Sequence, residues 1–153
     1  MTTESAREME AKQERIRQLI QADLGESATA GVNHLAVFAM DLEVTAEFYG
    51  DVLGMLVVNM SANRDVAESS HMNIHIGNGT MLSFCDFPHV PRLRRKAPEG
   101  VGGIMHIALP MRGERLPGVE AKPKARRVKY QEICGSMYFK DPNGLGIELM
   151  PTD

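Results

Sequence analysis

The stretch SMYFKDPNGLGIEL (residues 136–149) has β-prone residues on both sides of Asp-Pro-Asn-Gly, a strong turn signal. An earlier stretch, HIGNGTMLSF (residues 75–84), has the same order around Asn-Gly, the commonest signal of a two-residue hairpin. Upstream of each lies a short apolar segment with one histidine, VNHLAVF (32–38) and IMHIAL (104–109). The chain therefore contains an internal repeat, and each copy runs strand, connection, strand, strand, turn, strand.

The connection in the first copy has the pattern of a helix. Asp41 can cap its start, apolar residues recur every four positions from Val44 to Val52, and Gly54 can end it after Leu53. The strands expected after it are 56–59, 72–76 and 81–86.

The corresponding connection in the second copy differs. Residues 111–118 contain two glycines and a proline, which disfavour a helix, so we expect this copy to have lost most or all of its crossover helix. Residues 5–24 predict a further, charged helix before the repeat, ended by Gly25.

The composition is that of an ordinary single domain. The chain has 153 residues, 43% hydrophobic and 24% charged, and a net charge of −3, which argues against a nucleic-acid binder or a protein of anionic membranes. We expect no membrane span, because no apolar run approaches the roughly 20 residues a spanning helix needs. The polar N-terminus is unlike a secretory signal, and Cys85 and Cys134 predict reduced thiols, so a cytoplasmic location is expected.

Aligning the two copies places His34 opposite His106 and Ser83 opposite Glu148. A carboxylate between apolar Ile147 and Leu149 is costly to bury unless its charge is compensated, and a metal ion does so directly. Two imidazoles and one carboxylate form the open triad that suits Fe(II) and is also compatible with Mn(II). The alternative for each histidine is a hydrogen-bonded side chain on a strand with no metal.

Other candidates follow from strand alternation, which sends every second side chain to one face. Ser136 and Lys140 share a face with Tyr138, Asn73 shares one with His75, and Cys85 shares one with Ser83. His75 could accept and return a proton near neutral pH; His71 and His89 are its rivals. The basic residues 92–96 and 122–129 could steer an anionic substrate or simply face solvent.

Three stretches together resemble the vicinal oxygen chelate superfamily, which includes glyoxalases, extradiol dioxygenases and fosfomycin-resistance proteins. They are VNHLAVFAMDLEVTAEFYGDVLGM (32–55), IMHIAL and SMYFKDPNGLGIEL. The resemblance implies metal ligation by His34, His106 and Glu148. Ser83 stands where glyoxalase I and methylmalonyl-CoA epimerase have a further ligand, whereas extradiol and fosfomycin-resistance enzymes use two histidines and one glutamate. Tyr138, ten residues before Glu148, matches a pocket tyrosine of extradiol enzymes.

The resemblance also implies an α+β fold in which paired βαβββ modules form a curved mixed sheet that cups the metal. We then expect an N-terminal helix and linker (1–31) followed by one domain (32–153), made of module one (32–86), a connector (87–103) and a shortened module two (104–150).

The leading functional expectation is an extradiol-type dioxygenase that acts with O₂ on a small aromatic substrate with adjacent oxygens. Tyr138 and His75 would then be catalytic, and Ser83, Asn73, Ser136 and Cys85 would line the pocket. Two alternatives stay open: an O₂-independent lyase, isomerase or thiol transferase, including the fosfomycin-resistance type, and a metal-free protein that binds aromatic ligands or bleomycin. A homodimer is expected, with the site formed within one chain or across two.

Overall fold

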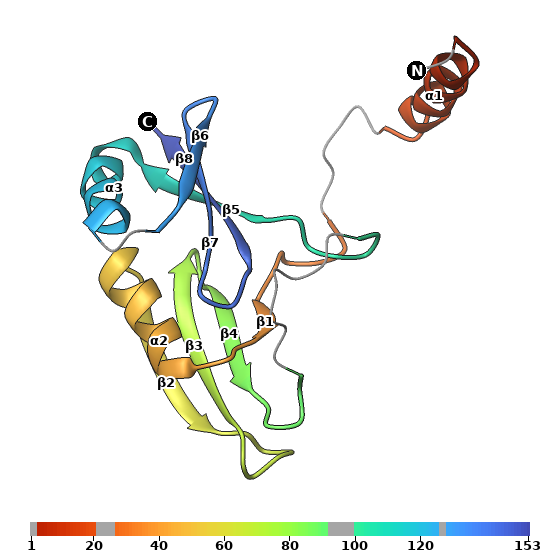
Figure 1. Ribbon diagram of the computed structural model, residues 1–153. Coiled ribbons are helices and arrows are strands. Elements are labelled where there is room, and N and C mark those ends of the chain that lie inside the picture. The colour runs from red at the N-terminus through yellow and green to blue at the C-terminus, as the bar shows by residue number, and fades with distance from the viewer. Residues whose placement is uncertain (1–2, 21–26, 92–99, 126–127) are drawn as a thin grey trace. The chain divides into compact units, whose positions relative to one another are not determined.

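A computed structural model describes residues 3–20, 27–91, 100–125 and 128–153 (Figure 1). It divides into two compact units, Met1–Gly31 and Val32–Asp153. The first contains α1 (Thr3–Arg17), whose side chains from residue 6 onward are exposed. The helix ends at Arg17, so the prediction that it continues through residues 18–20 was wrong: an exposed apolar stripe stabilises a helix poorly. Residues 21–24 lie outside the described part of the chain. Gly25 lies outside the described residues. No helix in the described part of the chain is long and apolar enough to cross a bilayer.

Module one forms a four-stranded mixed sheet in the order β1-β4-β3-β2, in which β1 and β4 are parallel. Its strands are β1 (His34–Phe38), β2 (Leu56–Ala62), β3 (Ser70–Gly77) and β4 (Thr80–Asp86). The predicted Asn78-Gly79 hairpin is confirmed: both residues have positive φ, as a turn of this kind requires.

The crossover of module one begins as predicted. The carboxylate of Asp41 accepts the backbone N–H of Val44 at 3.0 Å and caps α2 (Leu42–Glu47). A π-helical turn, η1 (Phe48–Val52), continues the helix. The helix ends before Gly54, which has a φ of +69°. Phe48, Tyr49 and Val52 of this turn are buried.

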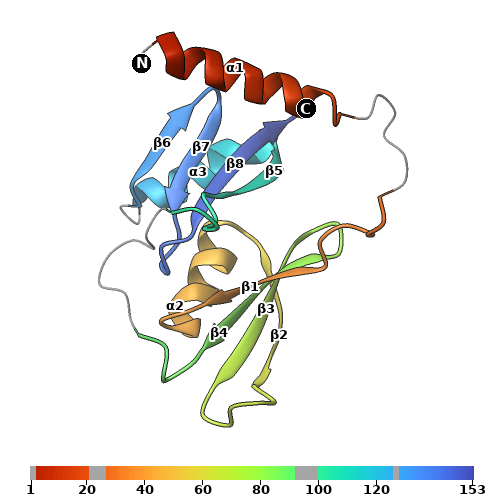
Figure 2. The same cartoon turned by 90° about the vertical axis from the view of Figure 1, so that its right-hand side faces the viewer.

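Module two repeats the same sheet in the order β5-β8-β7-β6, with β5 and β8 parallel. Its strands are β5 (Ile107–Arg112), β6 (Tyr130–Ile133), β7 (Ser136–Lys140) and β8 (Gly146–Thr152). In Figure 2 this sheet faces the viewer with the helix α3 behind it.

The prediction that module two had lost its crossover helix was wrong. A 3₁₀ turn, η2 (Gly113–Arg115), leads into α3 (Leu116–Ala125). Pro117 lies in the first helical turn, where no intrahelical bond needs its missing N–H, so it starts the helix rather than breaking it. Val119 is buried and packs α3 against the core.

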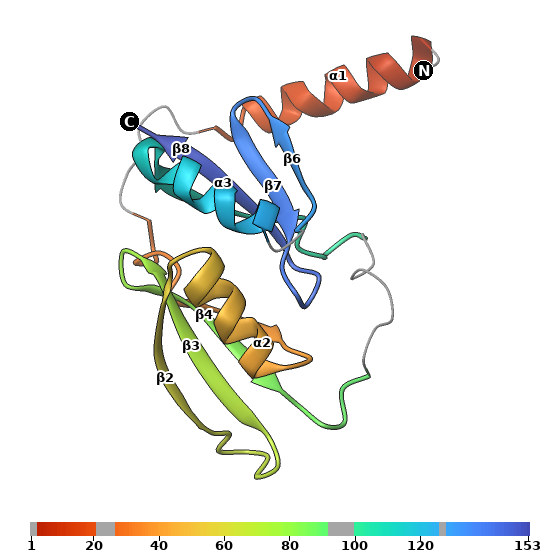
Figure 3. The same ribbon diagram turned by 60° about the vertical axis from the view of Figure 1, so that its left-hand side comes forward.

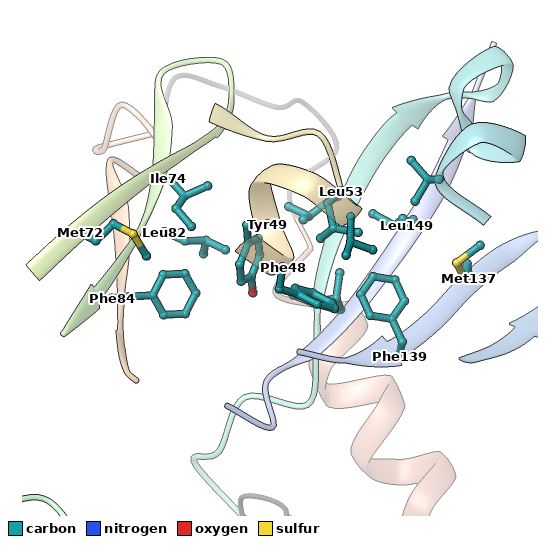
Figure 4. Packing of buried hydrophobic residues seen from close by; sticks show 14 of the residues in the cluster. Phe48, Tyr49, Leu53, Met72, Ile74, Leu82, Phe84, Met137, Phe139 and Leu149 are labelled. Atoms are coloured by element: carbon teal, nitrogen blue, oxygen red, sulfur yellow. The ribbon is translucent and has the colours of Figure 1, made fainter. Parts of the chain in front are cut away.

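The core lies between the two sheets and their crossover helices. Phe48 and Tyr49 lie side by side on the helix, with Tyr49 nearer Leu82 and Phe84 and Phe48 nearer Phe139 (Figure 4). The rings of Phe48 and Phe139 meet edge to face at 6.0 Å. Within residues 32–153, both crossover helices cover the same side of the sheets, so neither α2 nor α3 lies on the opposite faces (Figure 3). Those opposite faces carry the predicted site residues.

Candidate metal centre

The strand registers place His106 and Glu148 on the uncovered face of module two. Glu148 pairs with Ala108 on β5, and the next residue on this face toward the start of β5 is His106. Nε2 of His106 lies 3.0 Å from Oε2 of Glu148. Glu148 is only 8% exposed although it is charged, so a compensating partner is required. Two of the three predicted ligands therefore meet within one chain.

Tyr138 and Ser136 complete the surroundings of the Glu148 carboxylate. A hydrogen bond from the Tyr138 hydroxyl lowers the pKa of Glu148, aided by hydrogen bonds from Ser136 and His106, although desolvation acts the other way. The same bond to Glu148 raises the pKa of Tyr138, which stays a phenol. The ring of Tyr138 also meets that of His106 edge to face at 5.6 Å. Tyr138 thus orients both side chains at the centre.

The position of His106 depends on the absence of a side chain at residue 146. A Cβ added to Gly146 would lie 2.5 Å from the carbonyl oxygen of Met105 and 3.1 Å from Cα of His106. The chain leading into β5 can therefore approach β8 this closely only over a glycine.

We expect Gly146→Ala to push residues 105 and 106 away from β8 and to lower the free energy of unfolding by about 1–3 kcal/mol, as overpacking does. Urea unfolding measures this loss. Gly118→Ala is the matched control: it lies in α3 with no atom within 4 Å of the added Cβ, so it should be neutral or slightly stabilising. Equal stability of the two variants would contradict the argument.

The matching face of module one carries neutral groups. Ala36 pairs with Ser83 as Ala108 pairs with Glu148, and Asn73 occupies the place of Tyr138. The Ser83 hydroxyl donates to Asn73, which in turn donates to Asn59 at 2.9 Å. Asn59 was missed from sequence, because only the register of β2 brings it to this row. This face offers hydrogen-bonding groups rather than a second carboxylate.

The three histidines considered as proton acceptors do not all lie on this face. His75 lies on this face, and its Nε2 accepts the backbone N–H of Gly79 at 3.3 Å. His71 pairs with Ser61 through a 3.2 Å hydrogen bond on the same face. His89 instead lies in the loop after β4, against the ring of Phe87. Half-buried Cys85 shares the face of Ser83, and burial raises the pKa of its thiol.

His34 stands at the start of β1, exposed, with Nδ1 2.9 Å from Oδ1 of Asn33. Among the described residues, no group of three His, Cys, Asp or Glu side chains is close enough together to hold a metal ion. The structure of one chain thus brings together His106 and Glu148 but does not add His34 to them.

A buried polar cluster joins the modules, and the sequence analysis missed its role. Asp141, at the turn between β7 and β8, accepts the backbone N–H groups of Asn143 and Leu145 and the hydroxyl of Tyr49 in module one. Burial raises the pKa of Asp141 although these hydrogen bonds oppose the rise.

The neighbouring Asn143 makes the second half of this connection. Its side chain accepts the N–H of Met40 at 2.9 Å and donates to the hydroxyl of Thr45 at 3.1 Å. The Asp-Pro-Asn-Gly stretch was interpreted only as a turn, but its side chains also fasten module two to the start of α2. The sequence shows Tyr49 within the helix pattern but carries no signal for its burial or for its bond to Asp141.

Comparison with known proteins agrees with this architecture. The family model for the glyoxalase/bleomycin resistance protein/dioxygenase superfamily matches residues 31–112, which is more than half of the chain. The chain belongs to this superfamily. Its members in solved structures share the fold: FosX from Listeria monocytogenes has a TM-score of 0.62 at 19% identity, over 82% of this chain and 93% of that one. A glyoxalase/dioxygenase from Nostoc punctiforme has a TM-score of 0.65 at 17% identity, over 85% and 96%.

Two known proteins are similar in sequence. The uncharacterized protein YaeR of Escherichia coli K12 is 27% identical over 125 residues, which cover 77% of this chain and 93% of YaeR. The putative ring-cleaving dioxygenase MhqA of Bacillus subtilis is 30% identical over 94 residues. These residues are 60% of this chain but 27% of MhqA. One FosX structure holds Mn(II), so divalent metal binding occurs in the superfamily.

Proposed function

We propose that the protein is a metal-dependent dioxygenase that opens catechol-type rings. The observation that carries the proposal is the contact between His106 and Glu148, supported by Tyr138, on the open face of a superfamily module. Two ligands held at right angles by bonds of about 2.1 Å stand roughly 3.0 Å apart. The separation of 3.0 Å therefore fits neighbouring ligands of one divalent ion.

The third ligand in this proposal is His34 of a second copy of the chain. His34 is exposed on the uncovered face of its module, and so are the large apolar side chains Phe38 and Leu56, which are 62% and 65% exposed. A homodimer in which module one of one copy covers module two of the other would bury these residues and bring the imidazole to His106 and Glu148.

The ligand set supports chelation of a substrate with adjacent oxygens. His34, His106 and Glu148 would hold the ion and leave part of its coordination open to the reactants. Ser83 stands in the place of a fourth ligand, but it is neutral and its hydroxyl donates a hydrogen bond to Asn73. The metal, Fe(II) in this proposal and Mn(II) as the alternative, would hold both reactants and lower the pKa of a bound hydroxyl.

The chain's own residues would position the substrate and manage its proton. Tyr138 holds Glu148 as a carboxylate and fixes the ring of His106. His75 and His34 both pair with Met81 on β4, from opposite sides, so His75 would enter the shared site together with His34. Nε2 of His75 accepts the Gly79 N–H at 3.3 Å. For His75 to accept a proton from a substrate hydroxyl, Nε2 would have to exchange this long hydrogen bond for one from the substrate.

The dioxygenase proposal is tested by loading the purified protein anaerobically with Fe(II), adding a panel of catechols and admitting air. We expect a yellow ring-cleavage product, with one O₂ consumed per product. Glu148→Gln, treated identically, is the control for reactions of free iron. Turnover of a superfamily substrate such as an epoxide or hemithioacetal at the same rate without O₂ would replace the proposal by lyase or transferase chemistry.

The shared site makes a quantitative prediction for mixed variants. His34→Ala and Glu148→Gln should each be inactive, but subunit exchange between them should restore about a quarter of the wild-type activity, because half of the dimers are mixed and each has one intact site. A mixture of His106→Ala and Glu148→Gln should stay inactive. One subunit supplies both His106 and Glu148 to a site, so every site in a mixed dimer would lack one of the two ligands. No recovery in the first mixture would show that the site forms within one chain.

A further inference from the structure

Two lysines lie on the open face of module two beside His106 and Glu148. Lys140 is two residues after Tyr138 on β7, so its side chain shares the face of Tyr138, and it pairs with Gly146 on β8. Lys129 immediately precedes β6. Since Tyr130 pairs with Phe139, Lys129 comes opposite Lys140. Neither residue has a role in the metal centre proposed above.

The register puts Lys140 within reach of anything bound at His106. Lys140, Gly146 and His106 form one row across β7, β8 and the residue before β5. Neighbouring strands are about 4.8 Å apart, so roughly 10 Å separate the main chains of Lys140 and His106. No side chain stands between them, because the middle residue is glycine, and the flexible four-carbon stem of lysine can cross this space.

A cavity joins the same residues. It has a volume of about 1010 Å³, and its lining includes Lys129, Lys140, Tyr138 and His106 but not Glu148. This is enough room for a small aromatic molecule. Both lysines therefore border a space that reaches His106, where the far end of a metal-bound substrate could lie.

The two lysines have no acidic partner in the part of the chain that the structure describes: its ion pairs involve arginines and His106. Asp141 follows Lys140 directly, but its oxygens are taken by the N–H groups of Asn143 and Leu145 and by Tyr49. Two like charges placed opposite each other on a sheet repel. An anion between them would relieve that repulsion.

We propose that Lys140 and Lys129 bind an anionic oxygen group of the substrate, such as a carboxylate, and so make the enzyme selective for anionic over neutral aromatic substrates. This inference rests on the proposed metal centre, which would hold the two adjacent oxygens at the other end of the molecule. Lys140 would be the stronger determinant, since it is one strand closer to His106 than Lys129 is.

The experiment compares two ligands of similar shape by calorimetry on full-length protein loaded with Zn(II), which supports no ring cleavage. The ligands are 3,4-dihydroxybenzoate and the neutral 3,4-dihydroxybenzyl alcohol. We expect the anion to bind at least about tenfold more tightly, and this preference to weaken with salt. Lys140→Gln combined with Lys129→Gln should abolish the preference and leave the affinity for the alcohol unchanged.

Two further variants keep the result interpretable. Lys140→Arg retains the charge and should retain the preference, whereas Lys122→Gln removes an exposed lysine of α3 and should change nothing. Equal binding of both ligands to the wild type, or a preference that survives in the double variant, would overturn the proposal. A second probe, benzoate, lacks adjacent oxygens. Its lysine-dependent binding to metal-free protein would support the anion site even if the ring-cleavage assay failed.

Discussion

Replacing Glu148 by glutamine weakens divalent metal binding by at least about 100-fold in our expectation, because a neutral amide supplies no charge to the ion. Even residues that only orient a ligand contribute about 10–100-fold to metal affinity, and Glu148, 3.0 Å from the His106 nitrogen, is itself a ligand in our proposal. Ring cleavage should fall below detection with it. Metal content after dialysis and Mn(II) titration by electron paramagnetic resonance measure the effect.

The internal repeat provides the control for this change. Ser83 occupies the position of Glu148 in module one, so Ser83→Ala tests the same place in the fold without touching the proposed ligand set. We expect it to bind metal with wild-type affinity and to lose only its hydrogen bond to Asn73. Metal affinity that falls equally in both variants would mean that Glu148 acts through the fold rather than on the ion.

Asp141→Ala is expected to be the most destabilising single change in the domain, by about 3–5 kcal/mol. The substitution leaves the N–H groups of Asn143 and Leu145 and the hydroxyl of Tyr49 without their acceptor in the interior. Each unsatisfied buried group costs about 1–3 kcal/mol, and a site that can partly rehydrate recovers some of this loss. Urea unfolding followed by circular dichroism measures the change.

Two milder variants separate the turn from the connection between the modules. Asp141→Asn keeps an oxygen for the two backbone N–H groups. Tyr49→Phe removes only the hydroxyl that comes from module one, and should cost about 1.5–3 kcal/mol, as a bond to a charged acceptor does. If Tyr49→Phe were as stable as the wild type, the hydroxyl would not help to hold the modules together, and our account of the cluster would fail.

Much of the fold could be predicted from local sequence. The Asp41 cap, the Gly54 stop and the Asn78-Gly79 hairpin each depend on residues a few positions apart, so chain-local chemistry determined them. The crossover helix of module two was missed because composition alone cannot show that Pro117 falls in a first turn. Its stability comes from Val119 and the sheet beneath it.

The sequence by itself determined the repeat, the strand alternation and hence the opposition of His34 to His106 and of Ser83 to Glu148, because these follow from a period of two and from aligned copies. Only the tertiary structure decided which of them meet. Strand pairing brought His106 to Glu148 and placed Tyr138 across both. It also revealed the bond between Tyr49 and Asp141, 92 residues apart, which no local pattern encodes. Side chains so distant in sequence become neighbours only when packing of the whole domain outweighs the entropy of closing the chain between them.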